Sequence, residues 1–246
     1  MESIEFNFQK KTKNLDLVLP FSQHIEELRQ RLFFTVIVLL IISLVAFIEI
    51  RPIVHFLELP VPNVKFFQLS PGEYFLATVK IAFYTGILFA SPVIVSQLLF
   101  FVIPGLTSVE KQYIIPILIG SVVLFGISLG FSYYTLIPAA LGFFISYSAD
   151  TLEPLWSFNQ YFDFILVLFY TTGLAFQIPI FQIVLGLLGI VSGTQMFNIW
   201  KYIVLGATVI GAILTPSTDP VTQLLLSGAI LFLYFLGATI LLILKK

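Results

Sequence analysis

The chain has 246 residues, of which 59% are hydrophobic and 10% are charged. Soluble domains carry roughly a quarter of charged residues, so this composition excludes an ordinary soluble protein, and a formal net charge of −1 does not indicate a nucleic-acid partner. The absence of cysteine and the presence of only two histidines exclude disulfides, thiol chemistry and a histidine-rich metal or haem site. We therefore expect a polytopic membrane protein without a cofactor.

Residues 1–20 are polar and precede every apolar run, so they are predicted to form a soluble N-terminal tail. The tail contains acidic residues and no arginine, which is not typical of a transit peptide. Residues 21–246 are predicted to form one six-helix transmembrane domain. Its first part, 21–32, is expected to be a short amphipathic helix at the membrane interface, because Ile25, Leu28 and Leu32 share one stripe at helical spacing.

Six long apolar runs predict an all-α membrane protein with six transmembrane helices. The third run is predicted to end at Ile137, because Pro138 disfavours a continuing helix and the uncharged residues after it are too few to cross again. Residues 139–148 are then expected to form an amphipathic segment on the opposite side. The fifth run covers only about 24 Å as a helix, which predicts local thinning of the bilayer. The predicted spans are 32–48, 73–101, 112–137, 164–188, 199–214 and 221–244.

An even number of spans places both termini on one side of the membrane, which we call the near side. The far-side connections hold two basic residues, Arg51 and Lys65, and the positive-inside rule therefore places both termini in the cytoplasm or the stroma. Prolines, acidic residues and interfacial aromatics in the first-to-second and third-to-fourth connections predict a far-side cap built from these two loops. The nine near-side lysines and arginines are Lys10, Lys11, Lys13, Arg29, Arg31, Lys111, Lys201, Lys245 and Lys246.

Five short motifs occur in these segments. They are His24-x-x-Glu27-Leu28-Arg29-x-Arg31-Leu32, Ser70-Pro71-x-Glu73-x-Phe75, Phe101-x-x-Pro104-Gly-Leu-x-x-x-Glu110-Lys111, Gly173-x-x-Phe176-Gln177-x-Pro179 and Thr215-Pro-x-x-Asp219. In this order they resemble the signature elements of TatC, the polytopic core of the twin-arginine protein translocase, over residues 24–223. The resemblance departs at Gln177, where the family usually has a glutamate.

The resemblance implies a signal-peptide receptor and translocase core, not an enzyme, that moves folded proteins across an energised membrane using the proton gradient. It implies as partners the twin-arginine signal peptides of folded cargo, single-span subunits of the TatA and TatB type, and further copies of the chain. Nine lysines against three arginines, with 27 phenylalanines, indicate an AT-rich genome. This favours a plastid thylakoid membrane, with a bacterial inner membrane as the alternative.

Two near-side glutamates, Glu27 and Glu110, are the candidate arginine-binding groups. Paired carboxylates also serve as acid and base in catalysis, but no nucleophile or metal set accompanies these two. A guanidinium presents a planar fork of donors that a carboxylate accepts in bidentate fashion, so two separated glutamates suit two adjacent arginines. The resemblance assigns both glutamates to signal-peptide binding, together with Arg29, Phe101 and Pro104.

A structural alternative is that Glu27 only pairs with Arg31, four residues further along the same helix. Both interactions could alternate, with the peptide displacing Arg31.

Gln177 is predicted near the middle of the fourth span, where a polar side chain is either functional or an interhelical hydrogen-bonding group. The resemblance implies that Gln177 and Pro179 contact a partner helix, and Pro179 also predicts a kink. On the far side Pro71, Glu73 and Asp219 are expected to cap loops and helix ends. The side chain of Lys80 is expected to extend to the far interface.

The alternative function is a proton- or ion-coupled secondary transporter of a small solute. Such a protein is expected to show inverted repeats and a cluster of charges at the midplane, and the sequence shows neither.

Overall fold

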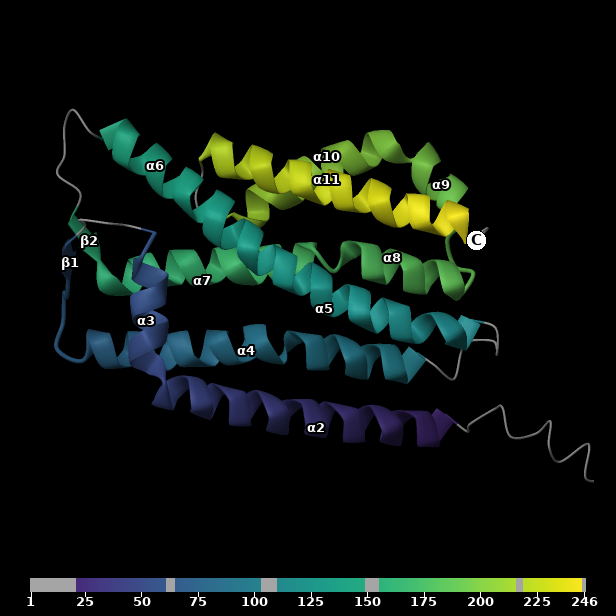
Figure 1. Ribbon diagram of the computed structural model, residues 1–246, viewed down its shortest axis with the longest axis horizontal. Coiled ribbons are helices and arrows are strands. Elements are labelled where there is room, and N and C mark those ends of the chain that lie inside the picture. The colour runs from purple at the N-terminus through teal and green to yellow at the C-terminus, as the bar shows by residue number, and fades with distance from the viewer. Residues whose placement is uncertain (1–20, 61–64, 103–109, 149–154, 216–218, 245–246) are drawn as a thin grey trace, which may run out of the picture.

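The computed structural model describes residues 21–60, 65–102, 110–148, 155–215 and 219–244, and in it long helices lie side by side (Figure 1). Among the described residues, five helical stretches are long and apolar enough to cross a membrane, and α10 (Trp200–Leu214) is a shorter apolar helix. Together they confirm the predicted all-α fold with six spans. The five long stretches are Ile25–Ile48, Glu73–Val102, Glu110–Ser148, Phe158–Leu187 and Pro220–Ile243.

The first span belongs to one continuous helix, α2 (Phe21–Ile48). The expected amphipathic segment is therefore the first part of this helix and not a separate interfacial helix, since 21–48 contains neither proline nor glycine to interrupt it. α2 contacts α4 (Glu73–Val102), and Gly86 of α4 allows the close approach. A Cβ atom added to Gly86 would lie 1.9 Å from Ser43 Oγ. Little of Ile25–Ile48 is buried within the chain, as suits an apolar helix at the lipid-facing edge.

The third span continues past its predicted end. The 3-10 turn η2 (Glu110–Tyr113), α5 (Ile114–Phe131), the π-helical turn η3 (Ser132–Leu136) and α6 (Ile137–Ser148) follow without a break. The prediction that the helix ends before Pro138 was wrong. A proline lacks an N–H donor and its ring collides with the carbonyl four residues earlier. In η3 the N–H of Ile137 bonds instead to the carbonyl of Ser132, so the helix is wider just before the proline and continues.

The fourth span consists of α7 (Phe158–Ala175) and α8 (Ile178–Leu187), separated by a turn at Phe176 and Gln177. Pro179 stands in the first turn of α8, where its missing N–H is tolerated. α7 packs against both α4 and α5 and carries much of the main buried core, which includes Phe162 and Ile165.

The last helices form a hairpin at the edge of the bundle. The short helix α9 (Gly193–Asn198) begins with a capping box in which Ser192 and Gln195 satisfy each other's backbone N–H groups. α10 follows, and α11 (Pro220–Ile243) returns alongside α8. Gly186 and Gly237 permit this contact, since an added Cβ would lie 2.2 Å from a Leu241 methyl group and 2.1 Å from Gln182 Oε1, respectively.

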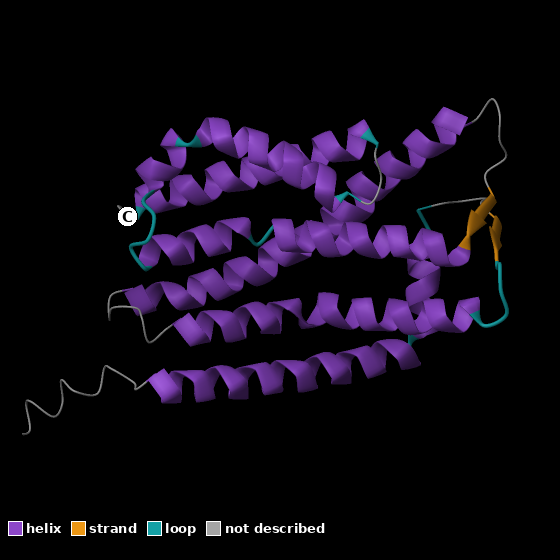
Figure 2. Cartoon of the chain, turned by 180° about the vertical axis from the view of Figure 1, so that it is seen from behind, coloured by secondary structure: helices purple, strands orange, loops and turns teal. Residues whose placement is uncertain are grey.

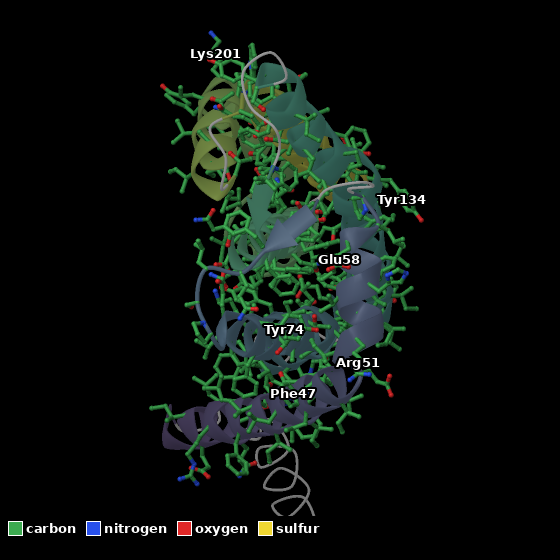
Figure 3. The ribbon with its side chains drawn as sticks, turned by 90° about the vertical axis from the view of Figure 1, so that its left-hand side faces the viewer. Phe47, Arg51, Glu58, Tyr74, Tyr134 and Lys201 are labelled. Atoms are coloured by element: carbon green, nitrogen blue, oxygen red, sulfur yellow. The ribbon has the colours of Figure 1, made fainter. Side chains whose placement is uncertain are left out.

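One end of the bundle carries a folded cap, which confirms the prediction for the two far-side loops (Figure 2). Strand β1 (Lys65–Phe67) comes from the first connection and pairs in parallel with β2 (Leu155–Ser157) from the other. Helix α3 (Ile50–Glu58) runs across this end of the bundle, and Figure 3 labels Arg51 near its start and Glu58 at its end. The hydroxyl of Tyr161 donates to the carbonyl of Leu57 at 2.7 Å and so ties α3 to α7.

The opposite end, called the near end from here on, gathers the N-terminus of α2, the end of α4, η2, the α8–α9 connection and the C-terminus (Figure 1). The described residues of the first and third motifs therefore lie at the same end of the molecule.

Candidate functional site

The near end of α2 holds an ion pair between two residues that are about one helical turn apart. The guanidinium of Arg31 donates through Nε and Nη2 to Glu27 Oε1, at 3.0 and 2.6 Å. Both side chains are 26% exposed, so the pair is shielded from solvent more than an ordinary surface pair. The pairing of Glu27 with Arg31, which their four-residue spacing offered as the structural alternative, is thus present.

Two residues of α4 complete this arrangement. Nη1 of Arg31 donates to Gln97 Oε1 at 3.2 Å, and its guanidinium carbon lies 5.8 Å from the centre of the Phe100 ring. That distance allows a cation–π contact. We call Glu27, Arg31, Gln97 and Phe100 the arginine cluster. Sequence reasoning missed Gln97 and Phe100, although a glutamine in an otherwise apolar span was a usable signal.

Glu110 is the first residue of η2 and is only 7% exposed. Its side chain is therefore enclosed at the start of the third span rather than standing free on the surface. Phe101, in the last turn of α4, is partly buried. Pro104 lies outside the described residues. The structure thus brings Glu27, Glu110 and Phe101 to the same end of the bundle (Figure 1).

Arg29 does not belong to the arginine cluster. Its side chain is 75% exposed and pairs with Glu26. Two residues of helix rotate a side chain by about 200°, so Arg29 and Arg31 point to nearly opposite sides of α2. Only Arg31 faces α4.

Gln177 is buried at the break between α7 and α8, with 3% of its surface exposed. Its Nε2 donates to the backbone carbonyl of Ser121 at 3.3 Å, and its Oε1 accepts from Ser121 Oγ at 2.7 Å. Both hydrogen bonds join the fourth span to α5, so the interhelical alternative is present within the chain. Pro179 is also buried. Both side chains are thus buried within this chain, and their contact with a partner helix stays a prediction.

Two of the far-side candidates act on loops and helix ends. The carboxylate of Glu73 accepts from the backbone N–H groups of Leu69 and Ser70 and from Ser157 Oγ, joining the turn that contains Pro71 to β2. Asp219, which is 1% exposed, caps α11 by accepting from the N–H of Thr222 at 2.8 Å.

The side chain of Lys80 is 37% exposed and pairs with a carboxylate of the neighbouring helix α7. Its Nζ lies 2.7 Å and 2.9 Å from the two carboxylate oxygens of Asp163, and it also donates to Asn159 Oδ1 at 3.0 Å. This pair joins α4 to α7. It was missed because the two residues are 83 positions apart.

Polar contacts thus concentrate at the two ends of a six-span helical bundle, and the polar side chain at the helix break is satisfied by a neighbouring helix. Fold and site define a polytopic, all-helical membrane protein whose ion pairs, among the described residues, lie towards the ends of the bundle. Residues 23–228 match the family described as Sec-independent protein translocase protein (TatC). The chain belongs to the TatC family.

Relatives and a solved structure agree with this assignment. The chain is 54% identical to Sec-independent protein translocase protein TatC of Synechocystis, a match covering 90% of this chain and 87% of the relative. It is 47% identical to the chloroplastic TATC of Oryza sativa, over 96% of this chain and 67% of the relative. A crystal structure of the twin-arginine translocase receptor TatC superposes with a TM-score of 0.79 and 35% identity, covering 89% of this chain and 99% of that one.

These relationships make the chain a component of a protein translocase and do not favour the coupled solute transporter. They also support a multi-pass protein of a thylakoid membrane or a bacterial inner membrane.

Proposed function

We propose that this chain is the receptor subunit that binds twin-arginine signal peptides at its near end. The observation that carries the proposal is the pairing of Glu27 with Arg31. Glu27 already accepts two N–H groups of a guanidinium, at 2.6 and 3.0 Å, which is the chemistry required to bind an arginine of a signal peptide.

Glu110 is proposed to bind the second arginine. A carboxylate that is 7% exposed interacts with a guanidinium more strongly than one in water, because the surrounding dielectric is lower. Phe101 is at the same end and offers an apolar surface beside the charges, suited to an apolar residue of the signal. Pro104, which lies outside the described residues, is proposed to belong to the same binding site, as the resemblance implies. Arg29 is proposed to act only indirectly, through its pairing with Glu26.

The near end is proposed to face the stroma or cytoplasm, with both termini on that side. In support, the exposed cations Lys111 and Lys201 both belong to near-end segments, whereas Arg51 stands on the far-end helix α3. Folded cargo is then taken up from the stroma or cytoplasm and delivered to the far side, driven by the proton gradient. The proposed activity is recognition and transport without a covalent step.

Single-span subunits of the TatA and TatB type, and further copies of this chain, are the proposed partners within the membrane. Gln177 and Pro179 are proposed to support such a contact indirectly, by fixing the break between α7 and α8. Leu174 and Phe181 flank this break and are 50% and 48% exposed. They offer an apolar surface to a partner helix.

Binding of signal peptides to single-residue variants tests the receptor proposal. Glu27→Ala and Glu110→Ala are each expected to weaken the binding of a twin-arginine peptide by about 1.5–3 kcal/mol, which is the contribution of a charge-assisted hydrogen-bonded pair. A twin-lysine peptide is expected to bind the parent protein poorly. Glu58→Ala is the control, since it also removes one carboxylate but Glu58 belongs to α3 at the opposite end of the bundle. Parent-like affinity in both glutamate variants would refute the proposal.

A further inference from the structure

Arg31 occupies the position at Glu27 that the proposed function gives to an arginine of the signal peptide. Its guanidinium directs Nε and Nη2 towards one oxygen of Glu27, so these two donors are committed before any peptide arrives. A second guanidinium cannot approach the same oxygen along the same directions. Because both residues lie on one helix, the local concentration of Arg31 at Glu27 far exceeds that of a free ligand.

The arginine cluster also offers Arg31 support that does not involve Glu27. Gln97 accepts from Nη1 at 3.2 Å, and the Phe100 ring lies under the guanidinium at 5.8 Å. Both come from α4, whereas Glu27 belongs to α2. Arg31 is therefore able to give up Glu27 and still keep a hydrogen bond and a cation–π contact.

From this geometry we propose that Arg31 is a built-in competitor for the signal-peptide site. It occupies Glu27 in the free receptor, and an arginine of the signal peptide must displace it, while Gln97 and Phe100 hold the displaced side chain. The inference rests on the proposed function of Glu27. Arg31 becomes a residue that sets the affinity threshold of the receptor, and Gln97 becomes a positioning residue.

A competitor of this kind has a defined thermodynamic signature. If only the fraction of receptors with Glu27 released binds peptide, the apparent dissociation constant is the intrinsic one divided by that fraction. The same factor applies to every peptide that uses Glu27, so Arg31 lowers all affinities together. Discrimination between arginine and lysine in the peptide comes from direct contacts and stays unchanged.

The test measures binding of a twin-arginine peptide and its twin-lysine counterpart to the full chain in detergent or nanodiscs. Arg31→Gln is expected to lower the dissociation constants of both peptides by the same factor, roughly 3- to 10-fold for the loss of a partly shielded intrahelical pair. Arg31→Lys keeps the charge but lacks the planar fork, so it is expected to give a smaller tightening. Lys201→Gln removes one exposed near-end cation outside the cluster and is expected to leave both affinities unchanged.

The double variant Glu27→Gln, Arg31→Gln separates this inference from the function on which it rests. If Arg31 acts only by occupying Glu27, removing Arg31 has no further effect once the carboxylate is gone, so the double variant should match Glu27→Gln alone. Unchanged or weaker binding in Arg31→Gln would overturn the inference. An Arg31→Lys variant that binds both peptides like the parent would also overturn the inference, because the effect of Arg31 would then come from its charge alone and not from its planar guanidinium. A Glu27→Gln variant that binds like the parent would instead overturn the proposed function.

Discussion

Replacing Gly86 by alanine is expected to force α2 away from α4. The new Cβ would lie 1.9 Å from Ser43 Oγ and 2.9 Å from Ser43 Cα. The hydroxyl group is able to rotate aside, but the Cα atom belongs to the helix backbone. Carbon atoms in contact normally stand about 3.5–4.0 Å apart, so the two helices have to separate by roughly half an ångström or more at this point.

The expected change in the free energy of unfolding combines two opposing contributions. Overpacking a close contact costs about 1–3 kcal/mol, while alanine in a helix is favoured over glycine by about 0.5–1 kcal/mol. A net loss of about 0.5–2 kcal/mol in the free energy of unfolding is expected. Gly126→Ala in α5 is the matched control, because nothing lies within 4 Å of its added Cβ, and it should show only the gain in helix propensity.

Thermal unfolding of the purified proteins, followed by circular dichroism, measures this difference, and signal-peptide binding reports on the position of Glu27. We expect Gly86→Ala to unfold at a lower temperature than both the parent and Gly126→Ala, and to bind the peptide more weakly. Adding Ser43→Gly removes two of the three close contacts and should restore part of the stability. If Gly86→Ala is as stable as Gly126→Ala, the close approach of the two helices does not carry the position of α2.

Two further predictions concern the helix break and the membrane topology. Gln177→Leu removes both hydrogen bonds to Ser121 and is expected to lower stability by about 0.6–2 kcal/mol and to weaken crosslinking to a single-span partner, with signal-peptide binding nearly unchanged. Gln177→Glu should be tolerated, because a protonated carboxyl group also donates and accepts hydrogen bonds. A Gln177→Leu variant that no longer binds the signal peptide but still crosslinks to the partner would reverse the roles assigned to the near end and to the helix break. Lys111→Cys should be labelled from the near side and Lys65→Cys and Glu153→Cys from the far side; near-side labelling of position 153 would contradict the six-span orientation.

The spans were predictable because charge-free runs report directly on the thickness of the bilayer. The third span was misjudged at Pro138, where the local rule that proline ends a helix was overridden by a π-helical turn five residues long. That turn depends on the whole helix being held between its neighbours, which no short sequence window contains.

The candidate site was predictable only in part. The spacing of Glu27 and Arg31 already indicated their pairing, since residues four apart share a helix face. The contribution of Gln97 depends on which face of α4 meets α2, and the burial of Glu110 and Gln177 depends on how separate helices contact one another. A single sequence carries the periodicity of each helix but not the rotation of one helix against the next.

The π-helical turn η3 also affects how this chain tolerates changes in length. Such a turn accommodates one residue more than an α-helix would over the same rise, so deleting a residue between Ser132 and Leu136 would leave a nearly unbroken helix. Because the turn already absorbs that residue, the helix beyond it would keep its phase, and Ile137 and Leu141 would stay buried. A deletion in the regular part of α5 would instead turn everything beyond it by about 100°, the rotation of one helical residue. The π-helical turn is therefore the place where the third span tolerates a change of length without losing its packing.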